Sequence, residues 1–239
     1  MNLVESKAGK FEGLLQNGCH QFFGIPYAKY NQRWEESFLI EEEICFKASK
    51  KGDSAPQTRS DDQSQSGASF FQDRSLSKQS EDCLTLNICS NNINAKNPVM
   101  IWIHGGALVT GGSSSIMYDL EHLAKKGIVV VSINYRLGPL GFLRLNEATN
   151  GLVNSSGNEG LIDQRNAIKW VKENISSFGG DPNNITIFGE SAGSWSCNLQ
   201  IAAGHDNLFQ KAICQSGGLD AIATKEKANQ WAELFTDQF

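Results

Sequence analysis

The chain has 239 residues, of which 40% are hydrophobic and 20% charged, a composition typical of a globular domain with one sizeable core. The formal net charge of −5 gives no indication of a basic surface, so we expect no nucleic-acid partner. The sequence has no basic segment followed by an apolar one at its start and no run of about 18 apolar residues. We therefore expect a cytoplasmic protein without a membrane span.

Six cysteines are spread along the chain, and none of them forms the C-x-x-C pair of a zinc or redox site. Without a secretion signal we expect free thiols, and a disulfide framework remains the alternative. The sequence contains no metal cluster, phosphate loop or nucleotide fingerprint, so we expect no cofactor. The cysteines are Cys19, Cys45, Cys83, Cys89, Cys197 and Cys214.

The N-terminal part, up to about Tyr30, is rich in glycine and aromatic residues, which suits short antiparallel strands joined by turns. Residues 50–80 differ, because serine, glutamine, aspartate and glycine dominate them. This composition predicts a long surface loop. A plain solvated loop is the favoured interpretation, and a cover over a pocket is the alternative.

Strand signals become clear after Asp82. Residues 84–88 alternate like a strand, whereas residues 98–103 and 128–133 are continuous apolar runs. Such runs suit parallel strands that are buried on both faces. Between the two runs, Leu120, Leu123 and Ala124 have the spacing of one helix face.

The C-terminal part continues the alternation of strands and helices. The spacing predicts a helix over 163–177, a strand over 185–188, a helix after Gly193 and a last strand over 212–214. This order indicates an α/β fold with a mostly parallel sheet, preceded by the N-terminal antiparallel section. We expect residues 1–239 to form a single domain.

The turn from Gly189 to Gly193 has the sequence Gly-Glu-Ser-Ala-Gly and joins a predicted strand to a predicted helix. A serine hydroxyl becomes a nucleophile only when it is exposed and has a neighbouring base. A sharp strand-to-helix turn exposes Ser191, and it needs glycine two residues to either side. Because the pattern alone arises by chance, the flanking elements carry the prediction that Ser191 is a nucleophile.

A second glycine-rich turn follows an earlier strand, at His104-Gly105-Gly106-Ala107. When a serine attacks an ester, the carbonyl oxygen becomes an anion that needs preorganised donors. We predict that the backbone N–H groups of Gly106 and Ala107, together with that of Ala192, form this oxyanion hole. His104 could serve as a base, but its place before the glycines favours a role in orienting the loop.

Taken together, these motifs resemble the type B carboxylesterase family, which includes carboxylesterases, cholinesterases and bile-salt lipases. The resemblance extends over several motifs in the family's order. They are Phe23-Gly24-Ile25-Pro26-Tyr27-Ala28, Ser80-Glu81-Asp82-Cys83-Leu84, Trp102-Ile103-His104-Gly105-Gly106, Asn134-Tyr135-Arg136-Leu137-Gly138, the segment 157–165, Phe178-Gly179-Gly180-Asp181-Pro182, the segment 188–193 and Gln215-Ser216-Gly217.

The resemblance implies an α/β-hydrolase fold that acts on a small-molecule carboxylic ester through a serine acyl-enzyme. It assigns the nucleophile to Ser191 and the oxyanion hole to Gly106, Ala107 and Ala192. It also implies two structural ion pairs, between Arg33 and Glu81 and between Arg136 and Asp163.

Two departures from the family pattern concern single positions. Secreted members bridge the cysteine at Cys83 to an upstream cysteine, where this chain has Ala55, which favours a reducing compartment. The loop that offers a tryptophan to choline in cholinesterases has Phe70 and Phe71 instead, so we expect no choline ester.

The third departure is length, because the resemblance covers only the N-terminal half of the family. In this fold the acid and then the histidine follow the serine. His205 is the only histidine after Ser191, and no acidic residue lies between them. We therefore expect a truncated chain that lacks the triad acid and histidine, with a complementary C-terminal half as a possible partner.

The missing half also affects the sheet and the choice between functions. With the C-terminal strands absent, the strand after 185–188, around Ile213, would leave an exposed apolar sheet edge. A non-catalytic interaction or scaffold protein of the same family is the alternative function. The intact serine turn beside an intact oxyanion loop favours the hydrolase.

Overall fold

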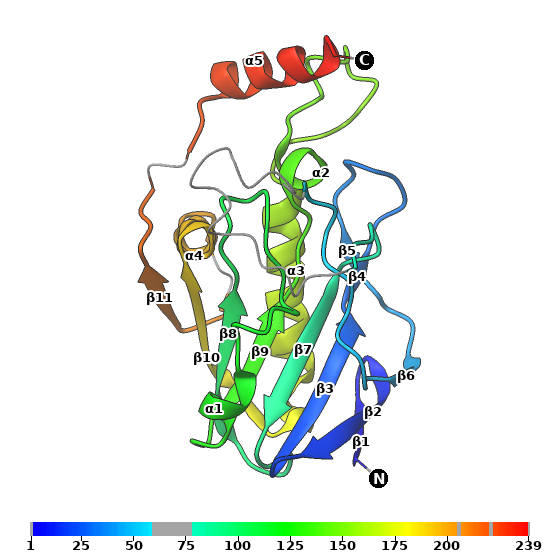
Figure 1. Ribbon diagram of the computed structural model, residues 1–239, viewed down its shortest axis with the longest axis vertical. Coiled ribbons are helices and arrows are strands. Elements are labelled where there is room, and N and C mark those ends of the chain that lie inside the picture. The colour runs from blue at the N-terminus through cyan, green and yellow to red at the C-terminus, as the bar shows by residue number, and fades with distance from the viewer. Residues whose placement is uncertain (1, 59–77, 205–206, 220–221, 239) are drawn as a thin grey trace.

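The computed structural model describes residues 2–58, 78–204, 207–219 and 222–238. Within these residues, a large mixed sheet and a separate two-stranded sheet are present (Figure 1). The large sheet has the order β1-β2-β3-β7-β9-β8-β10-β11, and β6 pairs with β2 beside this path. The predicted α/β class is confirmed. The predicted loop over 50–80 falls mainly on residues 59–77, which lie outside the described residues.

The N-terminal half of the sheet is antiparallel, as its glycine-rich and aromatic sequence predicts. β1, β2, β3 and β7 pair antiparallel in this order, and β7 also runs antiparallel to β9. The strands are β1 (Asn2–Ser6), β2 (Gly9–Gln16), β3 (Cys19–Pro26) and β7 (Thr85–Ser90), with the short strands β4 (Ala28–Lys29), β5 (Phe38–Leu39) and β6 (Ile44–Lys47).

The other half of the sheet is parallel. It contains β8 (Asn97–Ile103), β9 (Val129–Ile133), β10 (Gly180–Glu190) and β11 (Lys211–Gln215), which lie where the sequence predicts strands. All five residues of β9 are buried, as expected for a strand covered on both faces.

The expectation of burial on both faces is wrong for β8. From Val99 to Ile103 its residues alternate between buried and half-buried, and Trp102 belongs to the half-buried set. Aromatic side chains pack against Trp102 on this face of the sheet. The rings of Tyr118 and Phe188 lie 5.0 and 4.9 Å from that of Trp102.

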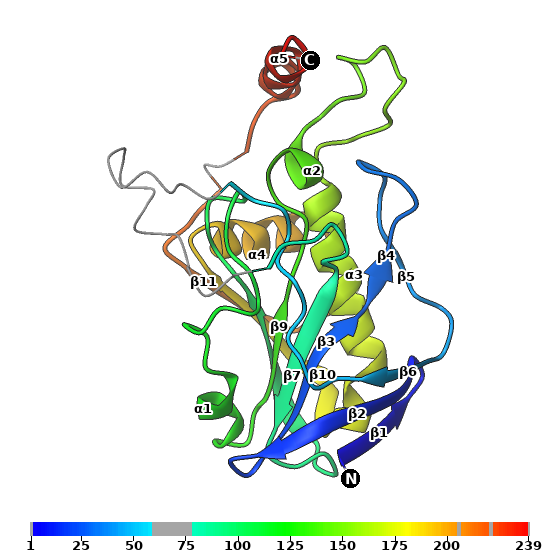
Figure 2. The same ribbon diagram turned by 45° about the vertical axis from the view of Figure 1, so that its right-hand side comes forward.

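Helices lie on both faces of the sheet (Figure 2). α3 (Glu159–Asn174) continues into the 3-10 helix η2 (Ile175–Phe178) and contacts α4 (Ala192–Ala202). α1 (Leu120–Ala124) packs against β7 and β9 on the opposite face. The remaining helices are α2 (Gly138–Phe142) and α5 (Lys225–Thr236), neither of which the sequence analysis predicts.

α3 begins at Glu159, four residues before the predicted start. The Glu159 carboxylate accepts hydrogen bonds from the backbone N–H groups of Ser156 (2.6 Å) and Gly157 (3.1 Å). A carboxylate in the first turn also interacts favourably with the helix dipole. Gly160, which discourages a helix, is needed because a Cβ there would lie 2.4 Å from the ring of Phe142.

The main core lies between the sheet and α3. The rings of Phe11, Phe22, Trp170 and Phe178 pack against one another with centroids 5.0 to 6.1 Å apart. A smaller apolar cluster beneath α1 contains Cys19 and Cys89 on the other face of the sheet.

All six cysteines are free thiols, as predicted. Cys83 and Ala55 are both buried in the main core. The two positions at which the resemblance implies a disulfide in secreted members therefore hold packed core side chains. No described helix combines the length and the apolar composition that crossing a membrane requires.

β11 is the last strand of the sheet within the described residues. Four of its five residues are exposed, including Ile213, whose side chain is 44% accessible. The predicted exposed edge is therefore present in the described part of the chain, and Ile213 is its large apolar side chain.

Candidate active site

Ser191 lies alone between β10 and α4, at a sharp turn of the backbone. Its φ and ψ are 54° and −121°, a region that L residues rarely occupy. A non-glycine residue in such a conformation persists only where the surroundings hold it there, which is typical of functional sites. The turn thus has the geometry that the sequence predicts.

Two close approaches explain the glycines on either side of Ser191. A Cβ on Gly193 would lie 2.1 Å from the carbonyl oxygen of Ile103. A Cβ on Gly189 would lie 2.5 Å from the carbonyl carbon and oxygen of Gly193. Both positions need glycine because β10, the start of α4 and the end of β8 meet there.

The backbone of Ser191 is tied to its neighbours. Its N–H donates to the carbonyl of Gln215 at the end of β11 (2.9 Å), and its carbonyl accepts from Trp195 N–H in the first turn of α4 (3.1 Å). Its hydroxyl does not cap the helix. The residue is partly exposed, so its hydroxyl is accessible to a reactant.

The glycine-rich loop after β8 lies directly against this turn. A Cβ on Gly105 would lie 2.6 Å from the carbonyl oxygen of Glu190 and 3.3 Å from the Cβ of Ser191. The two motifs are about 85 residues apart in the sequence, and the parallel pairing of β8 with β10 brings them together.

The next residues of the loop form a tight turn. The carbonyl of Gly106 accepts hydrogen bonds from the N–H groups of Val109 (3.0 Å) and Thr110 (2.9 Å). Ala107 and Leu108 have φ values of 54° and 62°, which is unusual for side chains of this kind. The turn leaves Gly106 half-buried and Ala107 exposed.

His104 is fully buried beneath this loop. Its Nδ1 lies 2.9 Å from the carbonyl oxygen of Gly105, and its ring stacks on Tyr135 with centroids 4.4 Å apart. Burial lowers the pKa of His104 to about 4, so the ring is neutral at pH 7. These contacts fit the predicted loop-orienting role better than that of a base.

Two further residues, Gln57 and Tyr135, also hold the loop. The Gln57 side chain donates to the carbonyl of Gly111 (2.8 Å) and accepts from its N–H (2.9 Å). The Tyr135 hydroxyl donates to the carbonyl of His104 (2.7 Å). The motif Asn134-Tyr135-Arg136 marked Tyr135 as part of a family pattern, whereas nothing in the sequence indicated the contact of Gln57.

Both ion pairs implied by the resemblance are present. Arg136 donates to the two carboxylate oxygens of Asp163 at 2.8 and 2.7 Å, and both side chains are buried. Burial opposes the charge of Arg136, but the hydrogen bonds and charge of Asp163 raise its pKa above the ordinary value. Arg33 binds Glu81 at the surface, with Nε 2.8 Å from Oε2.

The described histidines offer Ser191 no base. His20 lies 2.6 Å from Asn2 Oδ1, His122 is exposed on α1, and His104 is enclosed as described above. His205 lies outside the described residues, so the prediction that it cannot complete a triad stays a prediction.

Comparison with known proteins places these features in context. A sequence model described as "Carboxylesterase family" matches residues 1–239. The chain is 43% identical to the para-nitrobenzyl esterase of Bacillus subtilis (strain 168) over 241 residues, covering 98% of this chain and 47% of the esterase. It is 46% identical over 171 residues to the bile salt-activated lipase of Bos taurus, covering 66% of this chain and 28% of the lipase.

Solved structures agree with the sequences. The chain superimposes on a carboxylesterase of Geobacillus stearothermophilus with a TM-score of 0.86 at 36% identity, over 100% of this chain and 48% of that one. A thermophilic para-nitrobenzyl esterase gives a TM-score of 0.84 at 40% identity, with 48% of that chain covered. The chain therefore spans less than half the length of these relatives, and it has the α/β-hydrolase fold.

Proposed function

Since the chain belongs to the carboxylesterase family, we propose that it carries the nucleophile and the oxyanion hole of a serine carboxylic ester hydrolase. The observation that supports this most directly is the packing of Gly105 against the backbone of Glu190 and the Cβ of Ser191. A nucleophile and a set of oxyanion donors must lie within one substrate's width of each other, and these two turns are in contact.

In the proposed reaction, the Ser191 oxygen attacks the ester carbonyl and loses its proton to a base. The tetrahedral oxyanion then collapses, the alcohol leaves with a proton, and an acyl-enzyme remains on Ser191. Water attacks this intermediate in the same way and releases the acid.

We propose that the N–H groups of Gly106, Ala107 and Ala192 stabilise the oxyanion. Ala192 is the first residue of α4, so its N–H has no acceptor within the helix and lies at the positive end of the helix dipole. The Gly106–Ala107 turn is held from behind by the hydrogen bonds to Gly106 O described above. Donors fixed in advance lower the barrier because they need no reorganisation during the reaction.

The general base and its acid partner are proposed to come from a complementary C-terminal half, as in the family's triad. Two facts support this. No described histidine is positioned to contact Ser191, and the relatives are more than twice as long as this chain. The chain alone should then be a weak catalyst, because an oxyanion hole without a base leaves roughly a thousandfold of rate enhancement.

The proposed substrate is a carboxylic ester of a small molecule. Two relatives bear the names para-nitrobenzyl esterase and fumonisin B1 esterase, which refer to different esters. The ester bond is what these names share, so the proposal stops at that class. We also propose a reducing compartment such as the cytoplasm. The free thiols support it, and so does Ala55, which stands where the resemblance implies a cysteine in secreted members.

The test is covalent labelling of the purified chain with a fluorophosphonate, read by intact mass and by peptide mapping. We expect one adduct at Ser191, slow in the chain alone and faster when the C-terminal half of a relative is added. Ser191→Ala should abolish the adduct, and Ser176→Ala, which changes an exposed serine on η2, should leave it unchanged.

Two outcomes would contradict the proposal. Fast turnover of p-nitrophenyl acetate at Ser191 by the chain alone would show that its own residues complete the triad. A folded chain that stays unlabelled even with the complementary half present would favour the non-catalytic interaction protein.

A further inference from the structure

Two pairs of cysteines are in side-chain contact in the described structure, and they differ in their access to solvent. The thiol of Cys197 on α4 shares a side-chain hydrogen bond with that of Cys214 on β11. Cys19 and Cys89 are joined in the same way on the other face of the sheet. Cys19, Cys89 and Cys197 are buried, whereas Cys214 is exposed. Of these two pairs, the one between α4 and β11 therefore offers a thiol to a reactant in solvent.

The strand geometry places Cys214 on the face of β11 that α4 covers. Side chains two residues apart lie on the same face of a strand. Ala212 packs against the main core, which also contains Cys197. Ile213 lies on the opposite face and is 44% accessible. The Cys214 side chain therefore lies on the same side as Ala212, where α4 contacts β11.

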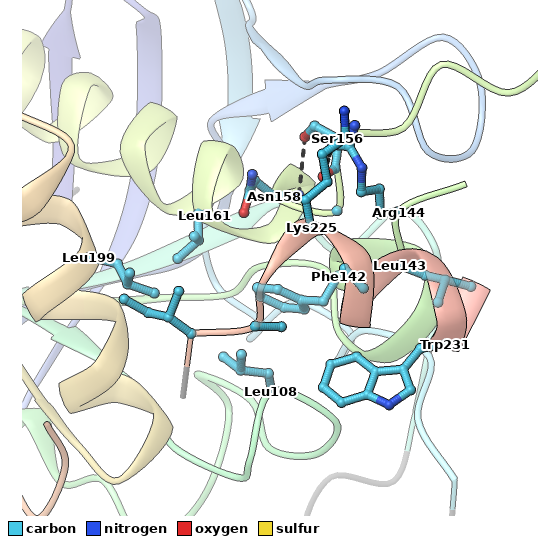
Figure 3. A pocket seen from close by; sticks show the side chains of 14 residues that line it. Leu108, Phe142, Leu143, Arg144, Ser156, Asn158, Leu161, Leu199, Lys225 and Trp231 are labelled. Carbon is cyan, nitrogen blue, oxygen red and sulfur yellow. Dashed lines mark hydrogen bonds between the residues drawn. The ribbon is translucent and has the colours of Figure 1, made fainter. Parts of the chain in front are cut away.

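The helix geometry places Cys197 on the side of α4 that faces the sheet. Leu199 points away from the sheet into a pocket that Leu108 and Trp231 also line (Figure 3). Cys197 comes two positions earlier, which is about 200° around a helix. It is fully buried in the main core. The two thiols thus meet between α4 and β11, and the contact does not belong to the pocket.

The two thiols suit the two steps of oxidation to a disulfide. Exposure lets Cys214 react first with an oxidant in solvent. Burial, together with the neighbouring Cys214, raises the pKa of Cys197 to about 12, so Cys197 stays a thiol at neutral pH. A shielded thiol in contact with an exposed one is placed to resolve the oxidised form of its partner.

We propose that Cys197 and Cys214 are a reversible redox pair, which a peroxide oxidises to a disulfide that links α4 to β11 beside Ser191. In a reducing compartment the pair rests as thiols, and the disulfide is transient. Gln215, the residue after Cys214, accepts the hydrogen bond from Ser191 N–H. The link therefore restricts local opening at the serine turn. The proposal does not depend on Ser191 acting as a nucleophile.

The oxidation balances with hydrogen peroxide as the oxidant. Cys214 loses its thiol proton, and its sulfur attacks one peroxide oxygen. The O–O bond breaks, Cys214 becomes a sulfenic acid, and the displaced hydroxide leaves as water with that proton. The Cys197 sulfur then attacks the Cys214 sulfur, the S–O bond breaks, and a second water leaves with the Cys197 proton. Two thiols are oxidised, and one peroxide is reduced to two waters.

Mass spectrometry of the purified chain tests the link. The reduced chain is treated with hydrogen peroxide near neutral pH and alkylated with N-ethylmaleimide. We expect the oxidised chain to lose two hydrogen atoms and to carry two fewer maleimide groups than the reduced chain. Tryptic cleavage after Lys211 puts Cys197 and Cys214 on different peptides, so the link appears as a joined pair that dithiothreitol separates.

Two exposed cysteines provide the matched variants. Cys214→Ser should abolish the joined peptides, and the exposed position should tolerate the change. Cys45→Ser removes an exposed thiol from β6, which lies across the sheet from β11, and it should leave the joined peptides unchanged. A disulfide that forms first between Cys19 and Cys89 would overturn the proposal. Oxidation of Cys214 to higher acids without a link to Cys197 would overturn it as well.

Hydrogen exchange at the Ser191 amide tests the effect of the link on the turn. We expect peroxide to slow this exchange about tenfold in the parent chain, because the disulfide restrains the segment that the amide binds. Dithiothreitol should restore the original rate, and Cys214→Ser should show no change with peroxide. Exchange at Ser191 that is equal in the reduced and disulfide-linked chains would overturn the proposed restriction of the turn.

These readouts are separate from those of the proposed function. Failure of Ser191 to label with a fluorophosphonate, beside formation of the Cys197–Cys214 link, would contradict only the hydrolase. Labelling at Ser191 in a chain that forms no such link would contradict only the redox pair.

Discussion

Two regions flank Ser191 and are held in different ways. The loop from His104 to Ser115 is bound by buried or half-buried side chains from distant segments, among them Gln57 and Tyr135. The segment from β11 to α5 instead exposes many of its apolar side chains. They are Ile213, Leu219, Ile222, Trp231 and Leu234.

The contrast shows which contacts hold the residues of the candidate site in place. The loop that carries the proposed oxyanion donors is fixed by contacts within the described residues up to 204. On the β11–α5 side, α5 is anchored by polar contacts of Asn229 with Arg144 and of Lys225 with Glu147. Changes on the loop side should therefore cost stability, and changes on the β11–α5 surface should not.

The largest expected effect is on the buried ion pair between Arg136 and Asp163. Asp163→Ala leaves the Arg136 guanidinium buried without its carboxylate, next to Tyr135. We expect the free energy of unfolding to fall by about 3–5 kcal/mol in urea denaturation. Arg33→Ala, which breaks the exposed pair with Glu81, is the control and should change stability little. Equal losses in both variants would show that the two ion pairs do not differ as their burial implies.

His104 gives the loop side a dependence on pH. Its pKa is about 4 in the folded chain and about 6.5 when exposed, so only the unfolded state takes up a proton between these values. The contribution of the neutral His104 ring to the free energy of unfolding is complete above pH 6.5. It is lost as the pH falls towards 4, by about 3 kcal/mol in total.

The measurement is urea unfolding at pH 7 and pH 4.5 in the parent chain and in His104→Gln. The variant lacks the titrating ring, so the difference in stability between the two proteins should shrink at the lower pH. A difference that is the same at both pH values would contradict the depressed pKa of His104.

A smaller loss is expected at Gln57. Gln57→Leu removes both side-chain hydrogen bonds to Gly111, leaving its N–H and carbonyl without these partners, at a cost of about 1–3 kcal/mol. Hydrogen exchange should speed up at Gly111 and in the neighbouring loop. Gln16→Leu, at an exposed position of β2, is the matched control. Unchanged exchange at Gly111 would show that Gln57 does not hold the loop.

The smallest effect is expected on the β11–α5 surface. Leu234→Ser changes a side chain that is 64% exposed, so the free energy of unfolding should change by no more than about 0.5 kcal/mol. Self-association, measured by sedimentation velocity, should decrease because an exposed apolar group is removed. A large loss of stability would mean that this side chain is buried in solution.

Much of the fold could be predicted because local patterns carry it. The runs at 98–103 and 128–133 predicted two parallel strands. Ala167, Ile168, Val171 and Ile175 predicted a buried stripe that runs along α3 into η2, and all four are fully buried in the structure. Gly189 and Gly193 were predicted from the turn that they allow. The geometry of that turn depends on neighbours within a few residues, which the sequence contains directly.

The unpredicted parts depend on contacts between distant residues or on weak local signals. The Gln57 side chain reaches Gly111 across 54 positions, and an amide gives no pattern from which that contact could be inferred. α5 did have a signal, since Thr224 caps it and Ala228, Trp231, Ala232 and Phe235 are spaced like one helix face. Only Ala232 of this helix is buried, so the helix contributes little to the core and its apolar spacing is a weak signal.

The hydrogen bond from Ser191 N–H to the carbonyl of Gln215 has a mechanical consequence. β11 is an edge strand among the described residues, and its last residue is bonded to the residue proposed as nucleophile. A second link, from Ser194 Oγ to the carbonyl of Gly217 (2.7 Å), joins the start of α4 to the same segment. A force that shifts the end of β11 is therefore transmitted to Ser191 through one hydrogen bond and to the first turn of α4 through the other, and pairing along that edge would stiffen the reacting group.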